Sequence, residues 1–120
     1  MSKDNVDERR SHVRFTLNAE CAFKFETGQI VEGYINDISI GGVFMLLDHS
    51  PDPSLWMNKE GEISIYCDCD GKTVTIEAIC RVVRAKDNGI GIFFQAMDND
   101  SKKNLSAVTG YLRKLINAGA

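Results

Sequence analysis

Alternating apolar and polar positions run through the chain between residues 15 and 96 and predict β-strands. Six segments show this alternation or a short apolar run: residues 15–26, 30–38, 42–48, 62–69, 72–84 and 90–95. The third is apolar almost throughout, which indicates a strand that is buried on both faces or locally twisted. Asp70-Gly71 and Asn88-Gly89 are strong hairpin signals, so we expect neighbouring strands to be antiparallel. Such strands form a barrel or a sandwich, and only a barrel leaves no exposed sheet edge.

The period changes after residue 97, where the apolar residues follow the spacing of a helix. These residues are Leu105, Val108, Leu112, Leu115 and Ile116. Residues 98–101 offer N-cap choices and Gly119 suits a C-terminus, so we expect one helix within residues 97–120. Its apolar stripe is most simply explained if the helix packs on the strands as a lid over one opening. A helix that binds a partner or forms a homodimer is the alternative.

The chain has 120 residues, of which 43% are hydrophobic and 26% charged, which is typical of one soluble globular domain with a single core. Its net charge of −3 disfavours binding to long nucleic acid, because that requires a basic face. The N-terminus has no apolar signal-peptide core, and no apolar run approaches membrane-spanning length. We therefore expect a cytoplasmic protein without membrane insertion.

The four cysteines lie at alternating positions of strand-like segments and are expected to be reduced in the cytoplasm. They are Cys21, Cys67, Cys69 and Cys80. Cys67-Asp68-Cys69 lacks the C-x-x-C spacing of a zinc site, so we interpret these residues as core or sheet-face thiols and expect no metal. The two histidines are accompanied by no nucleophile motif and no cluster of metal-spaced carboxylates, so the sequence favours a protein that is not an enzyme.

Two polar segments flank the first two predicted strands and carry the candidate chemistry. They are Arg9-Arg10-Ser11-His12-Val13-Arg14 and Asp37-Ile38-Ser39-Ile40-Gly41-Gly42. Guanidinium groups can bond the O6/N7 edge of guanine and neutralise phosphates, and a carboxylate can accept from the N1–H/N2–H₂ edge. Each segment also has a simpler interpretation. The first could be a solvated basic run, and the second a strand connection in which glycines adopt positive φ.

The two segments match the R-x-x-x-R and [D/N]-x-S-x-x-G signatures of the PilZ domain, and the chain resembles that family over nearly its whole length. Arg10 and Arg14 fill the arginine positions of the first signature. Asp37, Ser39 and Gly42 fill the fixed positions of the second. No signature position is missing, so the resemblance implies a member that binds its ligand.

A third match lies in the last predicted strand, Gly89-Ile90-Gly91-Ile92-Phe93-Phe94, which follows Arg81-Val82-Val83-Arg84. PilZ domains commonly end their barrel in this way. The resemblance therefore implies an all-β fold with a C-terminal helix, in which residues 15–96 form a six-stranded antiparallel β-barrel. Residues 1–14 would be a flexible arm, and residues 97–120 a helix packed on the barrel.

The ligand of PilZ domains is cyclic di-GMP, and the resemblance implies a defined set of binding residues. They are Arg9, Arg10, Arg14, Asp37, Ser39, Gly41 and Gly42. The arginines would bind guanine edges and phosphates, Asp37 the Watson–Crick edge, and Ser39 would add a hydroxyl bond. Gly42 would let the backbone approach the ligand. Arginine at position 9 goes in this family with an intercalated ligand dimer, and no further cofactor is implied.

The resemblance also predicts how such a receptor would signal. Cyclic di-GMP would gather the arm against the barrel, and this ordering would create or hide a surface for an effector protein. The signalling would control motility, biofilm formation or surface behaviour. The alternative is a PilZ-like interaction adaptor that works without ligand and would tolerate loss of the arginines.

Overall fold

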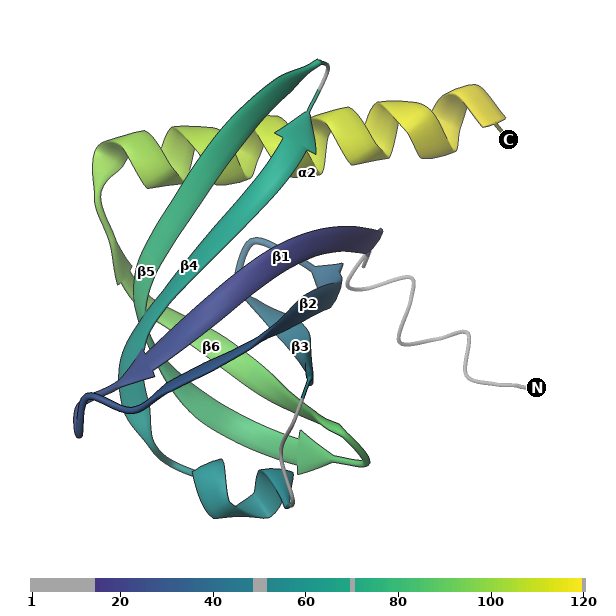
Figure 1. Cartoon of the computed structure of the whole chain (residues 1–120). Helices are drawn as coiled ribbons and strands as arrows, with labels where there is room; N and C mark the ends of the chain where they lie inside the picture. The colour runs from purple at the N-terminus through teal and green to yellow at the C-terminus, as the bar shows by residue number, and fades with distance from the viewer. Residues whose placement is uncertain (1–14, 49–51, 70, 120) are drawn as a thin grey trace.

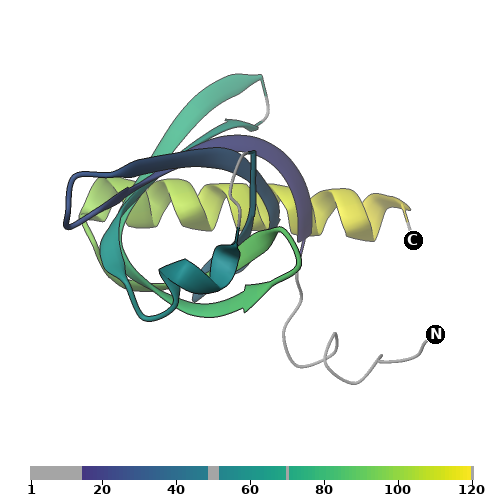
Figure 2. The same cartoon turned by 60° about the horizontal axis from the view of Figure 1, so that its bottom comes forward.

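The computed structural model describes residues 15–48, 52–69 and 71–119, and within these ranges the side chains of residues 19–115. In this part of the chain six antiparallel strands close into a barrel in the order β1-β2-β3-β6-β5-β4, and a long helix follows (Figure 1 and Figure 2). The strands are β1 (Phe15–Phe25), β2 (Ile30–Ile38), β3 (Gly42–Leu47), β4 (Glu60–Cys69), β5 (Lys72–Lys86) and β6 (Gly89–Met97). The 3-10 helix η1 (Pro53–Trp56) precedes β4, and α2 is Asn99–Gly119. The predicted barrel with a C-terminal helix is confirmed.

The turn between β5 and β6 lies one residue earlier than the sequence predicted. Lys86 pairs with Gly89, so Asp87 and Asn88 form the turn, and Asp87 takes a positive φ of 53°. Gly89 is instead the buried first residue of β6. A Cβ atom there would lie 2.5 Å from Cε2 of Phe44, so close packing against β3, and not turn geometry, requires glycine.

The inward-facing side chains of the strands form one core. Along β4, Ile63, Ile65 and Cys67 are buried and alternate with more exposed residues. All four cysteines are buried and free, which confirms the interpretation as core thiols. Burial raises the pKa of Cys21 and Cys80 to about 12 and that of Cys67 to about 11, so these thiols stay protonated at neutral pH.

The barrel is covered at one end by η1 (Figure 2). The Trp56 ring stacks on Phe25, with ring centroids 4.4 Å apart and an interplanar angle of 18°. Pro53 at the start of η1 is buried, whereas Met57, which follows it, is 36% exposed. Trp56 thus packs against the core, and Pro53 is buried beside it in the same helix.

Helix α2 lies across the other end of the barrel (Figure 1). Asp98 caps it, because its Oδ1 accepts a hydrogen bond of 2.7 Å from the N–H of Ser101. Leu105 and Val108 belong to the barrel core, whereas Leu115 is 51% exposed near the far end. The first half of the helix therefore acts as a lid, and a partner or dimer contact by the remaining turns stays a prediction.

Candidate ligand-binding site

Pairing between β1 and β2 brings the two predicted ligand-binding segments together. Phe15, the first residue of β1, pairs with Ile38, and Thr16 pairs with Asp37. The barrel therefore begins beside the connection formed by residues 37–42. Three predicted ligand-binding residues precede Phe15 and lie outside the described part of the chain: Arg9, Arg10 and Arg14. Their roles, like the predicted flexible arm, remain predictions.

Hydrogen bonds fix the connection between β2 and β3. The N–H of Ser39 donates to the carbonyl of Gly42 at 2.9 Å, and the Ser39 hydroxyl donates to the same oxygen at 3.3 Å. The N–H of Phe94 in β6 donates to the carbonyl of Gly41 at 2.9 Å. Asp37 and Ser39 are half-buried, and Gly41 is exposed. A carboxylate at the end of β2 and a hydroxyl on the following turn are thus held at the rim of the barrel, and the turn is hydrogen-bonded to β3 and β6.

The two glycines of this turn do not adopt the positive φ that the sequence predicted for a simple connection. Neither Gly41 nor Gly42 lies in the left-handed region. A Cβ atom on Gly42 would overlap the carbonyl oxygen of Ile92, so the close approach of β3 to β6 requires glycine there. A Cβ atom on Gly41 would meet no atom within 4 Å. Strand packing therefore accounts for Gly42 but not for Gly41.

An outward-facing row of residues runs from Asp37 across four strands. Asp37 in β2 pairs with Phe44 in β3, Phe44 with Gly91 in β6, and Gly91 with Arg84 in β5. Directly paired residues of antiparallel strands project from the same face. The Arg84 Cζ lies 5.3 Å from the centroid of the Phe44 ring, which is a cation–π contact. The sequence assigned no role to Phe44 or Arg84, because only the strand register reveals that they meet beside Asp37.

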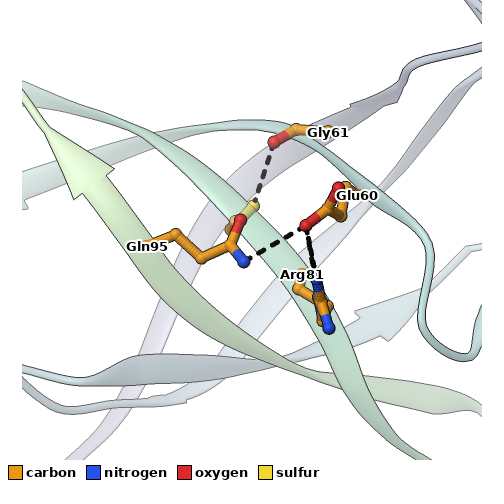
Figure 3. Close-up of polar contacts among 5 residues, drawn as sticks. Glu60, Gly61, Arg81 and Gln95 are labelled. Carbon is orange, nitrogen blue, oxygen red and sulfur yellow. Dashed lines mark hydrogen bonds and ion pairs between the residues drawn. The ribbon is translucent and has the colours of Figure 1, made fainter.

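A second row lies next to the first on the same outer face. Gly42 pairs with Phe93, Phe93 with Arg81, and Arg81 with Glu60, and Phe93 is 52% exposed. Oε2 of Glu60 accepts three hydrogen bonds: from Nη2 of Arg81 at 2.7 Å, from Nε of Arg81 at 3.3 Å and from Nε2 of Gln95 at 3.2 Å (Figure 3). The hydrogen bonds from Arg81 and then from Gln95 lower the pKa of Glu60. Arg81 thus forms an ion pair with the carboxylate of Glu60.

A groove of about 370 Å³ adjoins the β2–β3 connection and reaches α2. Ile40 of the connection lines it together with Phe94 and Met97 of β6 and Leu105 of the helix. Ile40 itself is 60% exposed. The turn that carries Ser39 therefore shares a mainly apolar surface with the helix.

The described residues form neither a metal site nor a membrane-spanning helix. No group of three or more His, Cys, Asp or Glu side chains among them could hold a metal ion. Their helices include none that is long and apolar enough to span a bilayer.

The chain belongs to the PilZ domain family, whose model matches residues 8–110 and so includes both predicted ligand-binding segments. This is a family of cyclic di-GMP receptors and adaptors. The match confirms the resemblance that was drawn from the two signatures. No functionally curated protein matches the sequence.

Solved structures of PilZ proteins share the fold at low sequence identity. The PilZ domain of YcgR from Escherichia coli, solved with c-di-GMP, is 14% identical with a TM-score of 0.66, over 92% of this chain and 97% of that one. The inhibitor of motility MotI/DgrA from Bacillus subtilis is 16% identical with a TM-score of 0.67, over 91% of this chain and 52% of that one. The PilZ domain of CeSA from a cellulose-synthesizing bacterium is 18% identical with a TM-score of 0.56, over 81% and 95%. This chain thus spans about half the length of MotI/DgrA.

Proposed function

We propose that this protein is a cyclic di-GMP receptor in which residues 9–14 and residues 37–42 bind the ligand together. The pairing of Phe15 with Ile38 carries the proposal, because it starts the barrel beside Ser39. Consecutive Cα atoms are about 3.8 Å apart. Residues that directly precede Phe15 in the chain can therefore reach the connection that contains Ser39. The family match spans both segments, and the PilZ domain of YcgR, which shares the fold, was solved with c-di-GMP.

The proposed roles follow from the hydrogen-bonding capacity of each side chain. The Asp37 carboxylate only accepts, so it suits the N1–H and N2–H₂ donors of guanine. The Ser39 hydroxyl donates to Gly42 and still has lone pairs with which it can accept from a ligand. Arg10 and Arg14 supply planar guanidinium groups that match the O6/N7 edge of guanine and also neutralise phosphates.

We further propose that two stacked ligands bind per chain. Arg9 precedes the R-x-x-x-R segment and adds a third guanidinium to Arg10 and Arg14. Two cyclic dinucleotides carry four phosphate charges, which three guanidinium groups balance better than two. Arg9 also offers a further planar surface on which a purine can stack.

The signal would pass to an effector protein in the cytoplasm. Ligand binding would order residues 1–14 against the barrel and change the surface beside the β2–β3 connection. The groove lined by Ile40 and Leu105 adjoins this connection. Ordering of residues 1–14 would therefore change the shape or the accessibility of this groove. An effector in motility is one candidate, because MotI/DgrA, which shares the fold, is an inhibitor of motility.

Isothermal titration calorimetry of the full chain with cyclic di-GMP and cyclic di-AMP tests this function. We expect binding of the guanine ligand only, because N1 of adenine is an acceptor that would face the Asp37 carboxylate. Asp37→Ala should weaken cyclic di-GMP binding by roughly tenfold or more, the usual cost of a charge-assisted hydrogen bond. Glu20→Ala, which removes an exposed carboxylate from β1, is the control and should leave binding unchanged.

The outcomes distinguish a cyclic di-GMP receptor from an adaptor that works without ligand. Equal affinity for both dinucleotides would contradict the role of Asp37. Failure of the wild type to bind cyclic di-GMP would contradict the receptor and favour the adaptor that works without ligand.

A further inference from the structure

We infer that Arg84, seated on Phe44, is a further ligand-binding residue that contacts a phosphate of the cyclic dinucleotide. The inference rests on the proposed receptor function and extends its site from the N-terminal arm and the β2–β3 connection to β5. Its basis is the outward-facing row, in which Asp37, Phe44 and Arg84 all project from the outer surface of the barrel and follow one another around it.

The glycines of β6 create the space in which this contact forms. A Cβ atom on Gly91 would lie 3.1 Å from Cβ of Arg84, a tight approach, and 3.8 Å from Cδ1 of Phe44, an ordinary contact, so a larger residue would crowd Arg84. Gly89 leaves room for the edge of the Phe44 ring in the same way. Phe44 is only 8% exposed although it faces outward. Arg84 therefore reaches across β6, and its guanidinium is held over the ring before any ligand arrives.

The reach of the Arg84 side chain brings its charge from β5 across β6 to Phe44 of β3, the strand next to Asp37. Asp37 in β2 and Arg84 in β5 lie on opposite strands of the closed barrel, and at about 4.8 Å per strand the path between their backbones along the curved sheet is about 14 Å. The guanidinium lies 5.3 Å from the ring of Phe44, which belongs to the strand next to Asp37. A ligand that contacts Asp37 and extends along the row over Phe44 would therefore meet this guanidinium.

The two arginines of β5 differ in the partners that the described residues offer them. Arg81 is bound to Glu60 by an ion pair of 2.7 Å. Arg84 has no carboxylate within ion-pair distance in the described part of the chain, and its contact there is with an aromatic ring. An unneutralised guanidinium can accept a phosphate without first giving up a salt bridge. Arg84 could therefore bind a phosphate without losing an ion pair, whereas Arg81 would have to give one up.

The phosphate charge of the proposed ligand would require a further cation, which Arg84 could supply. Two stacked cyclic dinucleotides bring four phosphate charges, whereas Arg9, Arg10 and Arg14 supply three compensating ones. Arg84 would be the fourth. Arg84 is attached to a strand of the barrel, so binding to it would cost little ordering of the backbone.

Calorimetry with cyclic di-GMP on two matched variants tests this inference. Arg84→Met keeps an unbranched apolar stem over Phe44 and removes the charge, and Arg81→Met makes the same change three residues earlier on β5. We expect Arg84→Met to weaken binding by roughly tenfold and to flatten its dependence on salt, whereas Arg81→Met should bind as the wild type does. Arg84→Lys should restore the salt dependence, because it restores the charge.

Thermal unfolding of the ligand-free variants accompanies the titrations, which are made below the lowest midpoint. Wild-type affinity in Arg84→Met would overturn the inference and leave the receptor function intact. Equal weakening by Arg84→Met and Arg81→Met would also overturn it, because the effect would then be one of overall charge. A wild type that does not bind cyclic di-GMP would overturn the receptor function and this inference together.

Discussion

The outer surface of the barrel has two sides of different chemistry. On β3, β6 and β5, aromatic and basic side chains stand next to the connection that carries Asp37 and Ser39: Phe44, Phe93, Arg81 and Arg84. Across the barrel, the exposed residues of β1 and β4 are mainly acidic, with one tyrosine and one lysine: Glu20, Lys24, Glu62, Tyr66 and Asp68. Both sides rest on the same apolar core.

The difference shows why the overall charge of this protein says little about its ligand. The net charge of −3 excludes a broadly basic surface, yet acidic residues on one side leave a cationic site on the other undisturbed beyond the screening distance of roughly 8–10 Å. The position of charges relative to the β2–β3 connection, and not their sum, decides what can bind.

The largest expected effect comes from removing an arginine of the predicted motif. Arg10→Ala or Arg14→Ala should weaken cyclic di-GMP binding by about 2–3 kcal/mol, because each removes charge-assisted hydrogen bonds. Lys24→Ala removes one positive charge from the other side of the barrel and should leave the affinity unchanged. Calorimetry on the three variants measures the contrast. Equal losses in all three would mean that the two sides do not differ in function.

The next largest effect separates strand packing from binding within the turn itself. Gly42→Ala should lower the free energy of unfolding by about 2 kcal/mol or more, because the added Cβ would overlap the carbonyl oxygen of Ile92. Gly41→Ala should change it by less than about 0.5 kcal/mol, because its Cβ would enter open space. Urea denaturation of the ligand-free proteins measures both. A Gly42→Ala variant as stable as Gly41→Ala would contradict the close approach of β3 to β6.

A smaller effect concerns the number of ligands that bind. Arg9→Leu should shift the calorimetric ratio from two ligands per chain toward one, because it removes one charge and one stacking surface while Arg10 and Arg14 remain. The salt dependence of binding should also flatten. A wild-type ratio of one that Arg9→Leu leaves unchanged would make Arg9 a solvated surface charge.

The smallest effect lies where the two sides meet, at the exposed contact between Glu60 of β4 and Arg81 of β5. Hydrogen bonds lower the pKa of Glu60 below its ordinary value of 4.5, so its charged form favours the folded state. This contribution is present above that value and is lost as the pH falls through the lowered pKa. Glu60→Gln should therefore unfold at a slightly lower temperature than the wild type at pH 7, and the two melting curves should converge in acid. A difference that persists in acid would assign the effect to packing and not to charge.

The sequence predicted the positions of the strands better than the contacts between them. The bounds of β2 agree with the prediction, since Thr27-Gly28 and Gly41-Gly42 limit an alternating run on both sides. The turn at Asn88-Gly89 was misplaced, because that dipeptide is typical of hairpins whereas Gly89 is needed for packing against Phe44. Local patterns therefore locate an element but do not distinguish a glycine required by a turn from one required by a neighbouring strand.

The candidate site was predictable only in the part that lies within a short stretch of chain. Asp37 and Ser39 belong to one signature, and the register confirms that this stretch forms the connection beside the first residue of β1. Arg84 and Phe44 are far apart in sequence and meet only because Gly91 separates them in the sheet. No local sequence pattern shows that two such distant residues are in contact. The part of the outward-facing row that contains Phe44 and Arg84 could therefore not be predicted from the sequence.

The way in which β1 closes the barrel has a consequence for how the chain is made. β1 pairs with β2, the next strand in the chain, and also with β4, where Cys21 stands opposite Ile65. During synthesis the first three strands therefore leave the ribosome with two open edges: the edge of β1 stays unpaired until β4 has followed, and the edge of β3 until β6 has followed. Open strand edges can join those of other chains, and pairings distant in sequence form slowly. The nascent protein would thus be most prone to aggregation midway through translation, and a truncated product that ends before β4 should not accumulate as a folded monomer.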